Sequence, residues 1–255
     1  MKWIAFAQRN QKELLRDPIS YVFCLGLPIV MLIVMTIINQ SIPAVEGAPQ
    51  VFRIEQLSPA IAIFAMTFLM LFVCIRVSSD RSTAFLTRLY ASPLQSSDFI
   101  LGYVLPFVLT GLAQIVITYA ASEVLALIVN GESLPIGNML LSVPLLLPSI
   151  VLFIGIGILF GTFFNAKAAP GLCSAVITGA AILGGIYMDI EAMGSSWKTV
   201  CSCFPFYHCV RYARLAMAGE FGDMLLPFAI CCAFTAVIFI ASILAFSFKM
   251  KSDKK

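Results

Sequence analysis

The chain has 255 residues, of which 60% are hydrophobic and only 11% are charged. Soluble domains carry about 25% charged residues, so this composition excludes an ordinary soluble protein and indicates an integral membrane protein. The formal net charge of +3 is assigned to loops that face the lipid bilayer, and we expect no nucleic-acid partner.

The first segment, residues 1–17, predicts an amphipathic helix. Lys2, Arg9 and Arg16 are spaced by seven residues and share one helical face, and Asp17-Pro18 ends the pattern. A basic helix placed before a membrane span lies in the headgroup layer; the alternative is a plain juxtamembrane linker. Its apolar core is too short for a signal peptide, so we expect the first span to stay in the mature protein.

Six apolar runs follow, each at least as long as the roughly 17–20 residues that cross a hydrocarbon core as a helix. In the fourth run, Pro144 and Pro148 suggest that the membrane part starts near Met139. We therefore predict an all-α polytopic membrane protein, one domain over residues 1–255, with transmembrane helices at 19–39, 57–77, 99–129, 139–164, 168–188 and 224–248.

The basic residues predict the orientation. Of the 16 Lys and Arg residues, all but Arg53, Lys198, Arg211 and Arg214 fall on the side of the two termini. Because cytoplasmic loops carry the excess of Lys and Arg, we expect both termini in the cytoplasm and a multi-pass protein of the cytoplasmic (inner or plasma) membrane.

The cytoplasmic segment 79–97 contains "RSTAFLTRLYASPLQ". Ser79 or Asp80 is a candidate N-cap for a helix over 81–91, and Pro93 ends it. At about 100° per residue, the large apolar side chains fill one arc of roughly 140° beside the two arginines. Aromatic and arginine residues grouped in this way are typical of interface hot spots, so we predict that another protein docks here. The residues concerned are Arg81, Phe85, Leu86, Arg88, Leu89, Tyr90, Ser92 and Pro93.

Glu123 lies among apolar residues near the outer end of the third predicted span. An acid in a membrane helix is costly and is often functional. Two interpretations stay open: a role in coupling or on the substrate path, and a hydrogen-bonded structural acid near the outer interface.

Small residues recur at four-residue spacing in two predicted spans. Gly157 and Gly161 form one such row, and Gly171, Ala175 and Gly179 form another. Such rows allow close helix contacts, and we expect both to pack against other helices.

The outer segment 189–223 follows Gly184-Gly185, which permit a break or sharp turn. Its apolar run, Thr199–Val210, has twelve residues, which is too short to cross and fits a re-entrant segment. We predict an outer gate or substrate path that includes Gly184, Gly185, Phe204, Phe206, Tyr207 and Glu123. An ordinary extracellular loop is the alternative.

The chain has 8 cysteines and 1 histidine. Cys201, Cys203 and Cys209 lie near His208 in the outer segment, but C-x-C-x5-C is not a standard zinc pattern. We favour buried thiols over a metal site or disulfide there, and predict no metal. The cysteines inside the predicted spans are interpreted as small apolar fillers.

Several catalytic motifs are missing from the sequence. It has no G-x-x-x-x-G-K-[ST] phosphate loop, no H-E-x-x-H and no G-x-S-x-G. We therefore predict no catalytic residues and no cofactor-binding residues, and an intramembrane enzyme is disfavoured.

Three stretches resemble the ABC-2 type permease family, the membrane subunits of type V-fold ABC exporters: "KELLRDP", "LTRLYASPLQSSDFILGY" and "CFPFYHCVRYARLAMAG". "RLYASPL" is similar to the family's R-L-x-x-S/T-P linker, and "FPFYHCVRYAR" to the element before its last span. Residues 189–198 differ, because family members often carry prolines there.

The resemblance gives each segment a role. It implies that residues 1–17 are an elbow helix, that 79–97 is a coupling region docked on a separate ATPase, and that 189–223 forms a re-entrant hairpin. It also implies an assembly with an ABC ATPase dimer, which binds ATP and Mg, and a second permease subunit, identical or homologous.

From these features we expect ATP-driven export of a hydrophobic or amphipathic substrate such as a drug, an antimicrobial peptide or a lipid-like molecule. The alternatives are a polysaccharide or glycolipid exporter, an ion-coupled secondary transporter that uses Glu123, and a membrane scaffold or signalling subunit that moves nothing.

Overall fold

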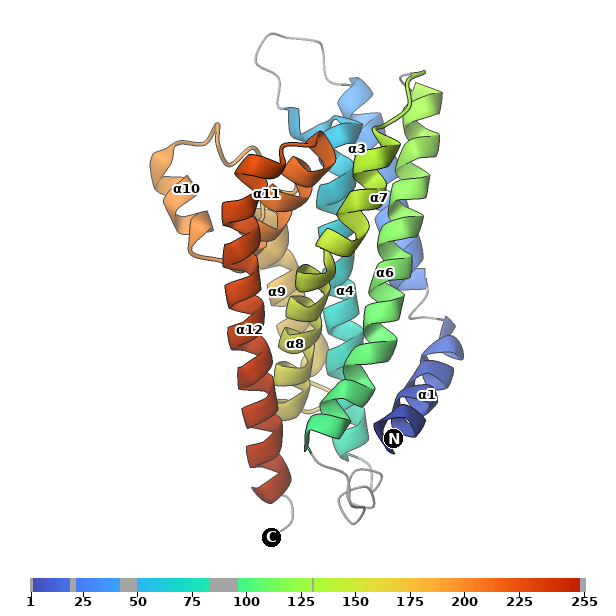
Figure 1. Cartoon of the computed structure of the whole chain (residues 1–255), viewed down its shortest axis with the longest axis vertical. Helices are drawn as coiled ribbons and strands as arrows, with labels where there is room; N and C mark the ends of the chain where they lie inside the picture. Colours follow the sequence, from blue (N-terminus) through green and yellow to red (C-terminus); the bar gives the residue numbers. More distant parts are fainter. Residues whose placement is uncertain (1, 19–21, 42–49, 83–95, 130, 253–255) are drawn as a thin grey trace.

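The computed structural model describes residues 2–18, 22–41, 50–82, 96–129 and 131–252. Within these ranges the chain is helical and contains no β-strand, so the predicted all-α fold is confirmed (Figure 1). The elements are α1 (Lys2–Leu15), the π-helical turn η1 (Val22–Gly26), α3 (Leu27–Ser41), the 3₁₀ turn η2 (Gln50–Phe52), α4 (Ile54–Ser82), α6 (Ser96–Val129), α7 (Ile136–Leu145), α8 (Leu147–Phe163), α9 (Ala169–Leu183), α10 (Ser195–Ser202), α11 (Pro205–Ala218) and α12 (Phe221–Ser252).

The long helices run between two ends of a bundle. At the lower end in Figure 1 lie α1, the end of α4, the start of α6, the end of α8 and the end of α12; at the upper end lie η2, the start of α7, α10 and α11. These two ends are called the lower end and the upper end below.

Five helical stretches of the described chain are long and apolar enough to cross a membrane: Val22–Ser41, Ile54–Arg81, Leu101–Val129, Ile136–Phe163 and Phe221–Phe248. The helix α9 is apolar but has 15 residues, which span about 22 Å at 1.5 Å per residue. A hydrocarbon core is about 30 Å thick. The predicted count of six spans therefore stays a prediction.

Helix α4 is the centre of the bundle and α12 lies at its periphery. In their most apolar windows 72% of α4 is buried inside the chain, compared with 11% of α12. α4 packs against α3, α6, α8, α9 and α11. Because α4 joins both ends through the core, side chains at either of its termini are well placed to affect the other helices.

The contact between α4 and α8 depends on two glycines. A Cβ on Gly157 would lie 2.6 Å from the Met70 carbonyl oxygen, and one on Gly161 would lie 2.8 Å from the Cys74 carbonyl oxygen. The row predicted at 157 and 161 therefore makes a close backbone contact. The row on α9 does not: a Cβ on Gly171 or Gly179 would meet nothing within 4 Å.

Several helix limits differ from the predicted ranges. The fourth span begins at Ile136, three residues before the expected start, and divides into α7 and α8 at Leu146. Pro148, at the start of α8, lacks the N–H that would continue the α7 hydrogen-bond pattern. Helix α9 ends at Leu183, before the predicted limit of 188, because the chain turns at Gly185 with a φ of 67°.

The predicted coupling region divides differently from the expectation. Helix α4 continues through Ser82 and α6 begins at Ser96. Asp80 therefore lies inside α4, which corrects its interpretation as the N-cap of a new helix. Residues 83–95 lie outside the described residues, and with them Phe85, Leu86, Arg88, Leu89, Tyr90, Ser92 and Pro93.

Helix α1 packs against the lower part of α6. The Phe6 ring fills the space over Gly102, where an added Cβ would lie 2.3 Å from the ring. The same ring meets Tyr103 edge to face at 5.0 Å between centroids. The amphipathic segment expected near residues 1–17 is therefore a helix whose buried face contacts protein.

Candidate functional site

A cluster of charges joins three helices at the lower end of the bundle. Its centre is Asp80 on α4, which is 4% exposed. The Asp80 carboxylate accepts a hydrogen bond from the Tyr103 hydroxyl at 2.8 Å. It also pairs with Arg9 of α1 at 3.2 Å and with Arg76, one turn earlier on α4, at 3.5 Å. A buried carboxylate needs such partners, because removing a charge from water is otherwise costly.

Glu13 completes this cluster from α1. Its carboxylate pairs with Arg9 at 2.9 Å and with Arg76. Two acids and two guanidiniums therefore alternate between α1 and α4, and the four charges cancel. Beside them Asn10 donates a hydrogen bond to the Gly102 carbonyl at 3.0 Å, which ties α1 to α6. We call Arg9, Glu13, Arg76, Asp80 and Tyr103 the polar junction.

Arg81 follows the polar junction directly and turns toward α8. Its guanidinium donates hydrogen bonds to the carbonyl oxygens of Gly161, at 3.1 Å, and Thr162. These carbonyls belong to the last turn of α8, where four C=O groups have no partner within the helix and carry the negative end of the helix dipole. Arg81, predicted as a docking residue, thus connects the end of α4 to the end of α8.

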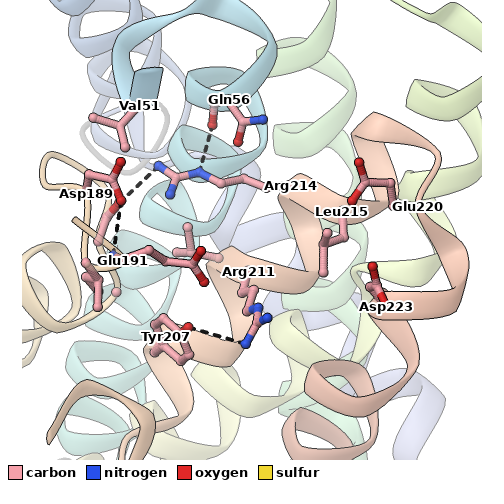
Figure 2. A pocket seen from close by; sticks show the side chains of 14 residues that line it. Val51, Gln56, Asp189, Glu191, Tyr207, Arg211, Arg214, Leu215, Glu220 and Asp223 are labelled. Atoms are coloured by element: carbon pink, nitrogen blue, oxygen red, sulfur yellow. Dashed lines mark hydrogen bonds between the residues drawn. The ribbon is translucent and has the colours of Figure 1, made fainter. Parts of the chain in front are cut away.

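A charged cavity of about 360 Å³ lies at the upper end (Figure 2). The turn after α9, helix α11, the start of α12 and the start of α4 contribute to it. Its lining residues are Val51, Gln56, Gly184, Gly185, Asp189, Ile190, Glu191, Tyr207, Val210, Arg211, Arg214, Leu215, Glu220 and Asp223. We call this space the upper cavity.

Arg214 holds two walls of the upper cavity together. Its Nε donates to the Gln56 carbonyl oxygen at 3.1 Å, and its Nη2 donates to the Gly185 carbonyl oxygen at 3.0 Å. Burial lowers the pKa of Arg214 to about 10, and the nearby Asp189 opposes this shift. The guanidinium is still protonated at neutral pH, so α11 stays bonded to α4 and to the glycine turn.

Arg211 lies on the other side of the upper cavity against Tyr207. Its guanidinium carbon is 5.8 Å from the centre of that ring, and Nη1 is 3.4 Å from the hydroxyl oxygen. Figure 2 shows Asp189 and Glu191 on one side of Arg214, and Glu220 and Asp223 on the other. The cavity therefore offers both signs of charge beside apolar walls.

The structure brings together only part of the predicted gate. Gly184, Gly185 and Tyr207 line the upper cavity. Phe206 stacks on Phe153 in the core, with centroids 6.0 Å apart. Phe204 precedes α11 and is 41% exposed.

Glu123 lies elsewhere, in the C-terminal part of α6, and its carboxylate bonds to the connection that leads to α7. One carboxylate oxygen accepts a hydrogen bond from the Ser133 hydroxyl at 2.6 Å, and the other accepts one from the Leu134 backbone N–H at 3.0 Å. This is the geometry of a hydrogen-bonded acid that holds the connection to the end of α6, in keeping with the second of the two interpretations above, and a role on the substrate path stays a prediction.

The outer segment contains two short helices, α10 and α11. His208 joins them, because its Nε2–H donates to the Ser202 carbonyl at 2.9 Å. Burial lowers the pKa of His208, and the neighbouring Arg211 lowers it further, although the Ser202 bond opposes the shift. Within the part of the chain that the structure describes, no three His, Cys, Asp or Glu side chains are grouped as metal ligands.

Sequence reasoning missed the polar junction. Arg9 and Asp80 are 71 residues apart, and their pairing depends on how α1 docks. The available signal was an acid at the end of an apolar run, four residues after Arg76 and directly before Arg81, which is an unusual place for a charge that has no partner.

Comparison with known families agrees with the earlier resemblance. The family model described as ABC-2 type transporter matches residues 1–218, from the N-terminus to the last residue of α11. No curated protein matches the chain. The match includes all five residues of the polar junction and most of the upper cavity.

Proposed function

Since this chain belongs to the ABC-2 type transporter family, we propose that it is the permease subunit of an ATP-driven exporter. Membership in the family implies a multi-pass membrane permease that works with an ABC ATPase. The proposal adds direction and cargo: export of a hydrophobic or amphipathic molecule from the cytoplasmic membrane. The partner ATPase dimer would bind ATP and Mg, and a second permease subunit would complete the transporter.

The proposed topology has six spans, with α9 and the residues around it as the fifth. The lower end would face the cytoplasm, because most of the Lys and Arg residues belong to it. In this arrangement α1 is the elbow helix, 79–97 is the coupling region, and α10 with α11 forms the outer re-entrant segment.

The polar junction supports a route for mechanical coupling. The segment that we propose as the ATPase docking site joins α4 to α6, and the junction binds α1 to both of these helices beside it. Arg81 adds α8 to the same group. A movement of this segment would therefore displace α1, α4, α6 and α8 together. The close contacts at Gly157 and Gly161 would transmit the movement between α4 and α8.

The upper cavity supports an outlet for an amphipathic cargo. Its charges could hold a polar end, while Val210, Leu215 and Ile190 offer apolar contacts. Glu123 gives no support to an ion-coupled carrier, because both of its carboxylate oxygens already accept hydrogen bonds in the loop. The family match is the single observation that carries the proposed function.

Co-purification tests the docking role. The tagged chain would be purified from its native membranes, and the ABC ATPase that accompanies the wild-type protein would be identified and measured. We expect the double variant Arg88→Glu with Leu89→Asp to lose this ATPase while its amount in the membrane is unchanged, because it places acids at an arginine and apolar docking surface.

Arg53→Glu is the matched control. It reverses the same charge at the upper end, and the Arg53 side chain is 61% exposed. It should keep the ATPase. A double variant that retains the ATPase at wild-type yield would refute the docking role, and uphill transport by the purified chain without any ATPase would refute the proposed function.

A further inference from the structure

Two cysteines meet in the core, and one of them, Cys209, directly precedes Val210 of the upper cavity. The sulfur atoms of Cys209 on α11 and Cys231 on α12 are 3.5 Å apart, and both residues are fully buried. The Ser149 hydroxyl lies 3.7 Å from the Cys231 sulfur and 2.7 Å from the Tyr212 hydroxyl. The two thiols are therefore in contact within a small group of polar side chains. Neither the proposed transport mechanism nor the family match assigns this group a role.

We propose that Cys209 and Cys231 form a reversible disulfide that locks α11 to α12 and closes the outlet of the transporter. A disulfide needs sulfur atoms about 2.05 Å apart, so the present pair has to approach by roughly 1.5 Å. The two helices already pack against each other. The locking effect rests on the proposed function, whereas formation of the disulfide does not.

The position of Cys209 and Cys231 determines what a disulfide between them would do. Cys209 precedes Val210 and Arg211, which line the upper cavity, and Cys231 is on the same helix as Asp223, which also lines it. Arg214 also bonds α11 to α4 and to the turn after α9. If the outlet opens by separation of α11 from the start of α12, a covalent bond between them prevents it.

The oxidant we infer is a small uncharged peroxide, because the site is buried among apolar helices. The sulfur of one thiol attacks a peroxide oxygen, the O–O bond breaks, and water and a sulfenic acid result. The second sulfur then displaces the hydroxyl group, which leaves as water with the second thiol proton. Two thiols and one hydrogen peroxide thus give one disulfide and two water molecules. Since both thiols are covered, the reaction requires local opening of the α11–α12 contact.

The test begins with the purified wild-type chain and needs no variant. After treatment with hydrogen peroxide and blocking of free thiols, peptide mass spectrometry should find Cys209 joined to Cys231, and dithiothreitol should separate them. Absence of this linked peptide after oxidation overturns the proposal.

The second part uses the transporter reconstituted with its ATPase. Peroxide should abolish transport by the wild type, and dithiothreitol should restore it, while Cys209→Ser should lose this sensitivity. Cys232→Ser is the matched control: Cys232 adjoins Cys231 but is half-buried, and the sulfur in contact with Cys209 is that of Cys231, so this variant should respond as the wild type does.

The two proposals fail in different ways. A linked peptide together with undiminished transport overturns the lock and leaves the transport function standing. Absence of transport by the reduced wild-type complex overturns the proposed function, while the linked peptide alone still reports the disulfide.

Discussion

Asp80 shows how the surroundings of one residue determine its role. In the sequence it follows two serines and precedes an arginine, which is the pattern of a helix N-cap. In the structure it is a buried acid that neutralises Arg9 and Arg76 and accepts a hydrogen bond from Tyr103. Because three helices meet at this one carboxylate, it is the residue of the polar junction whose loss should matter most.

We expect Asp80→Asn to destabilise the protein. The amide leaves two half-buried guanidiniums facing each other with only Glu13 between them. Breaking a buried ion pair by removing one partner costs about 3–5 kcal/mol. Since Arg9 and Arg76 keep about 30% of their side-chain exposure, we expect a loss of about 2 kcal/mol. The midpoint of thermal unfolding in detergent would measure it.

Tyr103→Phe tests the hydrogen bond to Asp80 on its own, because the charge of Asp80 stays in place. It removes only the hydroxyl donor and should cost about 1 kcal/mol. Asp223→Asn, at an exposed carboxylate of the upper end, should leave the midpoint unchanged. A midpoint for Asp80→Asn equal to that of the wild type would show that the junction contributes nothing to stability.

At the scale of helices, similar sequence patterns have different structural outcomes. Small residues spaced by four occur on both α8, at Gly157 and Gly161, and α9, at Gly171, Ala175 and Gly179. On α8 they face α4 and let the two backbones approach, whereas on α9 the positions at 171 and 179 meet no neighbour. The spacing shows that a close contact is possible, but the rotation of each helix about its axis determines whether it forms.

We expect Gly157→Ala to destabilise the pair α4 and α8. The new methyl group would lie 2.6 Å from the Met70 carbonyl oxygen, which belongs to the backbone and cannot move alone. Overpacking of this kind costs about 1–3 kcal/mol. Thermal unfolding in detergent would measure the loss, with Gly171→Ala as the matched control.

The control change introduces the same methyl group where no atom lies within 4 Å. Alanine is a better helix former than glycine by up to about 1 kcal/mol, so Gly171→Ala should keep or raise the unfolding midpoint. Equal effects of the two variants would contradict the assignment of the close contact to α8.

At the scale of the whole molecule, the arrangement of the helices separates two chemically different ends. α1 begins and α12 ends at the lower end, with the polar junction beside them (Figure 1). The upper end carries the upper cavity and the two short helices α10 and α11. If the lower end faces the cytoplasm, as the distribution of Lys and Arg indicates, the upper cavity opens on the outer side.

Cys203 tests this orientation. It is the exposed cysteine of the described chain, in the connection between α10 and α11, and the other described cysteines are buried or half-buried. A membrane-impermeant maleimide added to intact cells should therefore label the wild type, and Cys203→Ser should remove most of the label. Gel fluorescence of the purified chain would measure it.

Cys232→Ser should keep the label, because Cys232 is half-buried on α12. Labelling of Cys203 only after the cells are made permeable would invert the topology and place the upper cavity in the cytoplasm, which would contradict the proposed direction of export.

The sequence alone determined the class of this protein. Long uncharged runs can only be helices in a bilayer, because every backbone N–H and C=O must find a partner inside the segment. That requirement is local, so it could be read from composition and length, and the motifs "RLYASPL" and "FPFYHCVRYAR" correctly indicated the family that matches residues 1–218.

The tertiary structure alone decided which side chains meet. Arg214 bonds to Gln56 across 158 positions of sequence, Arg9 pairs with Asp80 across 71, and Cys209 touches Cys231 across 22. Each of these contacts depends on the rotation and depth of two helices relative to each other. Hydrophobic length does not specify either quantity, because an apolar helix satisfies the bilayer equally well at any rotation, and only packing between helices selects one.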